Sequence, residues 1–176
     1  MDESGRFGTA ISALMFLLLT GARLNEVLKL KWSYVDLERG LLLLLDSKTG
    51  KKAITLNSAS AAILAELKTK SDIKKNGEYV FYGVDPAIPR SDLKKPWAAV
   101  TGAAGLEGLR IHDLRHSFAS VGAGAGLGLP IVGKLLGHTQ ASTTQRYAHL
   151  DVDPLRKASN AIGSVLVNAL NVEIDG

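Results

Sequence analysis

The chain has 176 residues, enough for one domain with a buried core. Its formal net charge of +4 is a mild basic bias, compatible with a nucleic-acid partner without identifying one. The absence of cysteine excludes disulfides, thiolate nucleophiles and cysteine-based zinc sites. The apolar run 10–19 is too short to span a bilayer, and the acidic start is unlike a secretion signal. We therefore expect a soluble, cytoplasmic protein.

The chain opens with two predicted helices. Residues 7–20 are apolar nearly all round, which is typical of a buried helix, and we expect no domain before this helix. After a break at residues 20–22, Arg23 opens a second helix, whose buried stripe is Leu24, Val27 and Leu28. Arg23 and Glu26 are i,i+3 neighbours off that stripe. They predict either a surface ion pair, or a site in which Glu26 positions polar groups while Arg23 faces a ligand.

A β-hairpin is predicted next. Two short apolar runs, 41–45 and 53–56, are joined by a polar loop that contains Gly50. Lys48 would lie at or near the tip of this hairpin. A lysine in such a loop is usually only solvated, so Lys48 becomes relevant if the hairpin leans over a site.

The middle of the chain predicts two more helices. Asn57 or Ser58 can cap a helix over 59–70, and Ser91 can cap one over 92–101. Between them we expect a loop, a short strand and a linker, at residues 71–77, 79–82 and 85–90. The predicted fold class is therefore mostly α with a small antiparallel β-sheet (α+β).

A long amphipathic helix is predicted near the end of the chain. Asp153 and Pro154 suit its first turn. Its apolar stripe is formed by Leu155, Ala158, Ile162, Val165 and Ala169, widened by Leu166 and Leu170. We divide the chain into a domain at 1–152 and a helix with its tail at 153–176. That helix either packs on the same domain or docks on a neighbouring copy.

Polar residues that can act on an anion are concentrated between residues 110 and 150. As a helix at about 100° per residue, residues 111–125 place His112, Arg115 and His116 on one side. The opposite, apolar side consists of Leu114, Phe118, Val121 and Ala125. His138 follows, and Tyr147 comes on a short helix of its own if Ser142 and Gln145 form a capping box. Any one of these residues is more often structural than functional, and only the whole set favours a site.

This set is suited to metal-free attack on a phosphodiester. Arg23 and Arg115 can hold the non-bridging oxygens, because a guanidinium forks onto phosphate and stays charged. Tyr147 can act as the nucleophile, with a histidine to accept its proton. Lys48 can protonate the leaving oxygen. The candidate site contains no acidic cluster that would bind a metal, so we expect neither a metal nor a cofactor.

Five motifs, in this order and spacing, resemble the catalytic domain of the tyrosine recombinase (phage integrase) family. They are "TGARLNEVLKLKW", "DSKTGK", "HDLRHSFAS", "LLGH" and "TTQRYAHL", and the resemblance spans residues 7–150. It implies site-specific recombination of double-stranded DNA, by cleavage and rejoining through a 3′-phosphotyrosine intermediate. It also implies a homo-oligomer on DNA and association with the nucleoid.

The resemblance implies a role for each matching residue. Arg23 and Arg115 match the two phosphate-binding arginines, and Lys48 matches the hairpin lysine that acts as general acid. His112 matches the first position of H-x-x-R, as a proton acceptor or hydrogen-bond partner. His138 matches a position near the phosphate, and Tyr147 matches the nucleophile. Glu26 matches an acidic residue that supports the site.

The chain departs from the family pattern because members usually carry an N-terminal DNA-clamping domain. We therefore expect either a fragment or dependence on a partner, with weak and strongly salt-sensitive DNA binding by this chain alone.

Three other functions fit part of the pattern. His112 and His116 have the spacing of a zinc-binding helix, with Asp113 between them and a third ligand from His138 or His149. That reading leaves Arg115 unexplained. The second is a non-catalytic module that binds DNA or a partner, and the third is relaxation of supercoils by a type IB topoisomerase, which uses a similar residue set.

Overall fold

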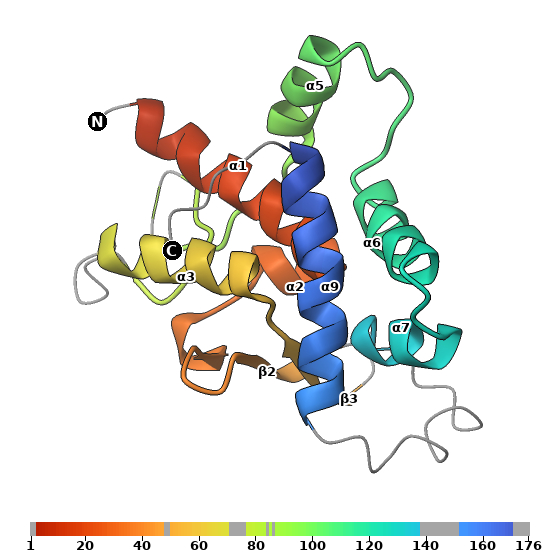
Figure 1. The fold of residues 1–176 in the computed structure, drawn as a ribbon. Helices are drawn as coiled ribbons and strands as arrows, with labels where there is room; N and C mark the ends of the chain where they lie inside the picture. The colour runs from red at the N-terminus through yellow and green to blue at the C-terminus, as the bar shows by residue number, and fades with distance from the viewer. Residues whose placement is uncertain are drawn as a thin grey trace.

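The computed structural model describes residues 3–47, 50–70, 77–83, 85, 87–137 and 152–170. Its elements (Figure 1) are α1 Glu3–Thr20, α2 Leu24–Leu28, η1 Trp32–Tyr34, β1 Val35–Asp36, β2 Leu41–Ser47, β3 Gly50–Thr55, α3 Ser58–Lys70, α5 Lys94–Ala103, α6 Asp113–Gly124, α7 Leu129–Leu135 and α9 Val152–Leu170. The predicted fold class, mostly α with a small antiparallel sheet, is confirmed. No helix in the described part of the chain is long and apolar enough to cross a membrane.

The sheet is antiparallel, in the order β1-β2-β3. The predicted hairpin is confirmed as β2 and β3, with pairs from Leu41↔Thr55 to Leu44↔Lys52. The strand expected at 79–82 is wrong, because this segment forms only the isolated bridges Lys31↔Tyr79 and Tyr82↔Pro89. Two of its apolar side chains enter the core without a ladder of backbone pairs, which explains the misleading pattern. The third strand is β1.

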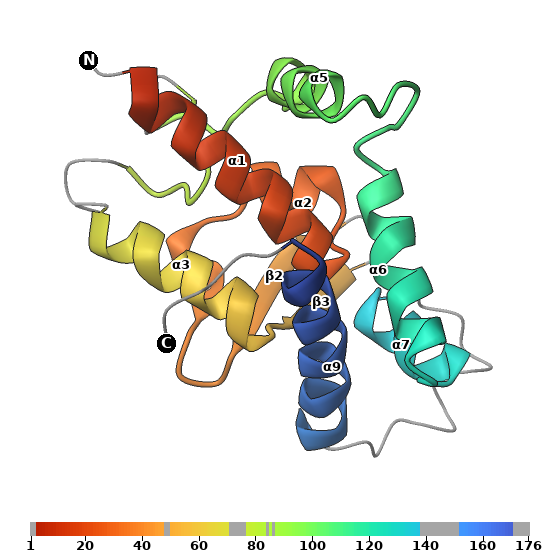
Figure 2. The same ribbon diagram turned by 45° about the horizontal axis from the view of Figure 1, so that its top comes forward.

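Two groups of buried side chains meet along α1. The first joins α1 and α2 to the sheet and α3, and includes Phe16, which lies 5.6 Å from Phe81 between ring centroids. The second joins Leu19, near the end of α1, to α6, α7 and α9. Both ribbon views show α9 between α3 on one side and α6 with α7 on the other (Figures 1 and 2). Helix α1 therefore ends where the hairpin, α6 and α7 converge.

Helix α9 packs on α1, α3, α6, α7 and β3 of its own chain. Its buried face differs from the predicted stripe: Ala158, Ile162 and Leu166 are buried, whereas Val165 is 48% exposed and Ala169 is exposed. Helix α6 approaches α9 closely at Gly122, where an added Cβ would lie 2.9 Å from Ile162 Cδ1. Because other helices pack on two sides of α9, the buried face of α9 does not include Val165 or Ala169.

The helix boundaries follow local hydrogen bonds. Asn57 caps α3 as predicted, because its Oδ1 accepts the Ser60 N–H at 2.8 Å. Ser91 does not cap α5, since Asp92 Oδ1 accepts the Lys94 N–H at 3.0 Å and the helix starts later than expected. Helix α7 was not predicted, although Pro130 in its first turn is a known start signal.

Candidate active site

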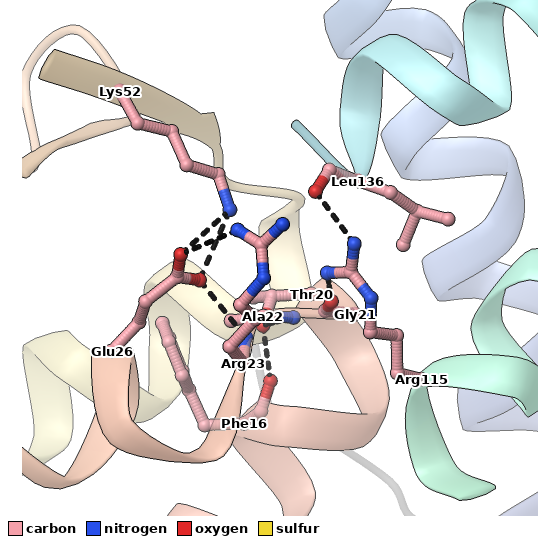
Figure 3. A network of polar contacts seen from close by, with 9 residues as sticks. All are labelled: Phe16, Thr20, Gly21, Ala22, Arg23, Glu26, Lys52, Arg115 and Leu136. Atoms are coloured by element: carbon pink, nitrogen blue, oxygen red, sulfur yellow. Dashed lines mark hydrogen bonds and ion pairs between the residues drawn. The ribbon is translucent and has the colours of Figure 1, made fainter. Parts of the chain in front are cut away.

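The joint between α1 and α2 positions Arg23. Gly21 has a φ of +61°, a left-handed conformation that ends α1 and suits glycine. The Thr20 hydroxyl donates to the Phe16 carbonyl at 2.6 Å and accepts the Ala22 N–H at 3.3 Å. These bonds hold the turn in one shape (Figure 3), so the following residue, Arg23, leaves it in a defined direction.

Arg23 and Glu26 form a partly buried pair, with side chains 35% and 10% exposed. Glu26 Oε2 accepts the Arg23 backbone N–H at 2.9 Å, and its Oε1 accepts from Arg23 Nη1 at 3.0 Å. A carboxylate at the start of a helix also interacts favourably with the helix dipole. Glu26 therefore holds both the backbone and the guanidinium of Arg23.

Lys52 completes the hydrogen bonding of Glu26. Its Nζ lies 3.1 Å from Oε1 and 3.0 Å from Oε2, and its side chain is only 7% exposed. Burial by itself raises the pKa of Glu26, but the Arg23 N–H and the Lys52 charge outweigh it and hold that pKa below its usual value. Burial lowers the pKa of Lys52 and outweighs the opposing effect of the Glu26 carboxylate, while the nearby charges of Arg23 and Arg115 lower that pKa further.

Arg115 is buried, with 7% of its surface exposed. Its Nη1 donates to the Gly21 carbonyl and its Nη2 to the Leu136 carbonyl, the latter at 2.8 Å. The prediction that Arg115 faces outward beside two histidines is wrong, because it lies on the buried side of α6 with Phe118. Two backbone carbonyls from distant segments make this burial possible. Burial lowers the pKa of Arg115, and the charge of Arg23 lowers it further.

The two guanidinium groups converge. Figure 3 shows Arg23 between the Glu26–Lys52 pair on one side and Arg115 on the other. Arg23 and Lys52 bind the carboxylate of Glu26, and Arg115 lies near enough to feel its charge. These four side chains therefore carry a formal excess of two positive charges. Such an arrangement favours an anion with several oxygens.

The two histidines of α6 lie on its exposed side, as predicted. His112 is the N-cap, and its ring lies 5.0 Å from that of His116, edge to face at 85°. Asp113, between them, binds Arg110 at 2.8 Å, which lowers the pKa of this carboxyl to about 2. Among the residues that the structure describes, no three His, Asp or Glu side chains group as a metal site.

Three predicted site residues, Lys48, His138 and Tyr147, lie outside the described residues, as does His149. The described chain reaches Gly137, directly before His138, and the Leu136 carbonyl already binds Arg115. The structure thus brings together Arg23, Glu26 and Arg115.

Lys52 was missed at the sequence level. Strand alternation could have found it, because Lys52 and Ile54 are two residues apart on β3 and so point to the same face. Ile54 is 2% exposed, and that face is buried. A lysine in a β-strand with an inward apolar neighbour therefore predicts a buried partner, here Glu26.

Two solved structures that share the fold are integrases. The integrase of mycobacterium phage Brujita has a TM-score of 0.70 at 17% identity, covering 88% of this chain and 52% of its own. The Tn1549 transposon integrase, solved in complex with circular intermediate DNA, has a TM-score of 0.59 at 18% identity, covering 85% and 56%. At these identities the likeness establishes the fold.

Residues 9–153 match the phage integrase family, and the chain belongs to that family. This range contains all seven predicted site residues. The chain is 36% identical over 154 residues to the tyrosine recombinase XerA of Thermococcus onnurineus, covering 82% of this chain and 53% of that protein. The chain thus spans about half the length of this curated relative.

Proposed function

We propose that this chain is the catalytic domain of a site-specific DNA recombinase, which cleaves and rejoins a strand through Tyr147 without a metal. The observation that carries the proposal is the convergence of Arg23 and Arg115 beside a buried Glu26–Lys52 pair. A phosphodiester would relieve the repulsion between the two guanidinium groups, and would gain more as negative charge builds in the transition state. Family membership supports the same assignment.

The proposed reaction is an in-line displacement at phosphorus. The Tyr147 hydroxyl loses its proton to His112, its oxygen bonds to phosphorus, and the bond to the 5′ oxygen breaks. Lys48 gives a proton to that leaving oxygen, which becomes a free 5′ hydroxyl. His138 would hydrogen-bond a phosphate oxygen. Attack by a 5′ hydroxyl on the 3′-phosphotyrosine reverses these steps and joins strands.

The expected substrate is double-stranded DNA. One relative is named a tyrosine recombinase, and one structural neighbour was solved with circular intermediate DNA. Exchange of strands between two duplexes requires several active sites, so we propose a homo-oligomer on DNA that works at the nucleoid, in the cytoplasm. The C-terminal part of α9 exposes Val165 and Leu170, which are candidates for contact with a second copy.

The test is a cleavage assay with a pool of nicked duplexes in EDTA, followed by a denaturing gel. We expect a covalent protein–DNA adduct with the wild type and none with Tyr147→Phe. Tyr82→Phe is the matched control, because this tyrosine lies outside the proposed site, and it should retain the adduct. An adduct that persists in Tyr147→Phe would show that Tyr147 is not the nucleophile.

The same assay separates the other functions. A metal-dependent hydrolase would lose activity in EDTA and would leave no adduct. A non-catalytic binding module would bind DNA without cleaving it, and the wild type and Tyr147→Phe would give the same gel shift. Relaxation of a supercoiled plasmid without exchange between two duplexes would instead indicate a topoisomerase.

A further inference from the structure

Lys52 contacts two parts of the site at once. Its ammonium group binds both oxygens of Glu26, at 3.1 and 3.0 Å. Its aliphatic stem lies against the backbone of Gly137: a Cβ added to this glycine would be 2.3 Å from Lys52 Cε and 3.0 Å from Cδ. Strand β3 thus reaches both α2 and the segment that follows α7.

Gly137 cannot carry a side chain beside Lys52. Its φ of +70° is left-handed, and the space above its α-carbon is taken by the lysine stem. The free end of a lysine usually moves aside at little cost, but this one is held by two hydrogen bonds to a buried carboxylate. The neighbouring Leu136 carbonyl binds Arg115, so the backbone here is restrained from both sides.

We infer that Lys52 is a positioning residue of this site. Through Glu26 it holds Arg23, and through Gly137 it holds the backbone that continues into His138. It thereby maintains the spacing between the first arginine and the chain that leads from α7. The inference rests on the proposed function for its effect on cleavage, but its two contacts can be tested without DNA.

The charge and the stem of Lys52 make separable contributions. Lys52→Met keeps an unbranched stem of similar length and removes the ammonium, so Glu26 loses its partner. Lys52→Arg keeps a positive charge that can bind both carboxylate oxygens. Lys70→Met is the matched control, because Lys70 is also ion-paired with a glutamate, Glu66 at 2.5 Å, but is 70% exposed on α3.

The first measurement is single-turnover cleavage at saturating DNA, with the Kd for DNA measured separately. We expect Lys52→Met to slow cleavage roughly 100-fold, the loss typical of reacting groups displaced by about 1 Å, with little change in Kd. Lys52→Arg should recover most of the rate, and Lys70→Met should match the wild type. A wild-type rate in Lys52→Met, or a loss confined to Kd, would overturn the inference.

The second measurement needs no DNA and compares two glycines. Gly126 has a φ of +76° with nothing within 4 Å of an added Cβ, so Gly126→Ala measures left-handed strain alone. Gly137→Ala should lower the unfolding midpoint further than Gly126→Ala does, and Lys52→Ala should abolish that excess. If Gly137→Ala still lowers the midpoint further than Gly126→Ala when Lys52 is alanine, the proposed contact between Lys52 and Gly137 is wrong.

A third readout follows the carboxyl pKa of Glu26 by NMR. Lys52→Met should raise it, since a nearby positive charge is lost, and Lys52→Arg should restore it. An unchanged pKa in Lys52→Met would overturn the role through Glu26. If the wild type forms no covalent adduct, the proposed function fails, and these two DNA-free measurements decide the inference about Lys52.

Discussion

The Gly21 carbonyl accepts a hydrogen bond from Arg115, which lies 94 residues further along the chain. This bond joins the turn that presents Arg23 to the helix that carries the second arginine. The same guanidinium donates to the Leu136 carbonyl at 2.8 Å. One side chain therefore ties three segments of the candidate site together.

Gly21→Ala should destabilise the fold by about 3 kcal/mol, the sum of left-handed strain and overpacking. An added Cβ would lie 2.7 Å from Leu136 Cδ2 and 2.8 Å from Phe118 Cδ1. Gly105→Ala is the control, because Gly105 has a similar φ of +65° and nothing within 4 Å of an added Cβ. It should cost only about 1 kcal/mol. Urea denaturation of both variants checks this, and equal losses would contradict the packing argument.

Arg115→Lys should destabilise the protein even though it keeps the charge. Arg115 serves the carbonyls of Gly21 and Leu136 with two separate nitrogens, whereas a lysine has a single ammonium nitrogen at one point. One of the two carbonyls is therefore left buried without its partner, at about 1–3 kcal/mol. Under the proposed function, cleavage should also fall by roughly 100-fold or more, the usual cost of losing one donor to a developing charge. Denaturation and single-turnover cleavage measure the two effects.

The control for Arg115→Lys is Arg110→Lys. Arg110 is 73% exposed and pairs with Asp113 on the surface, so this change should leave both the stability and the cleavage rate close to those of the wild type. Equal losses in the two variants would show that burial of Arg115 does not matter.

Glu26 should make stability depend on acid pH. Its pKa is lower in the fold than its ordinary value of 4.5, so its contribution is present above that pH and is lost as the pH falls through the folded pKa. Glu26→Gln should therefore cost about 3 kcal/mol near neutral pH, because it leaves Lys52 buried without a charged partner. The difference in unfolding free energy between the wild type and this variant should narrow as the pH falls below 4.5 through the folded pKa of Glu26.

Denaturant unfolding across this pH range measures the effect of Glu26→Gln. Glu66→Gln is the control, since Glu66 is 64% exposed in its pair with Lys70, and its cost should stay below about 1 kcal/mol. If the difference in unfolding free energy between Glu26→Gln and the wild type stays constant down to acid pH, the pKa of Glu26 is not lowered in the fold.

Helix α9 should be required for the stability of the fold. Ile162 is fully buried, and Ile162→Ala should cost about 2–5 kcal/mol, whereas Val165→Ala, at a position 48% exposed, should cost less than about 1. Thermal unfolding checks both. Removing residues 154–176 should then weaken folding as well as any contact between copies. A truncated chain with an unchanged melting temperature would contradict this packing.

Local pattern was sufficient for most of the elements. The all-apolar run before Thr20 predicts a buried α1, and the two short apolar runs around Gly50 predict the hairpin β2–β3. Asn57 predicts the start of α3, because its side chain accepts a hydrogen bond from a residue only three positions further along the chain. These features are decided by neighbours in the chain, where helix and strand periods apply directly. Periodicity says nothing, in contrast, about which tertiary neighbours will cover a face.

The arrangement of the site depends on such neighbours. Arg115 looks like an outward-facing residue by period, yet it is buried because carbonyls 94 and 21 residues away in sequence supply its partners. Lys52 is buried because Glu26, 26 residues earlier, offers it a carboxylate. The amino-acid sequence alone therefore determines most of the helices and strands and the motifs that they carry. Tertiary structure decides which charges are buried together, because a buried charge is tolerated only where distant segments supply its hydrogen bonds.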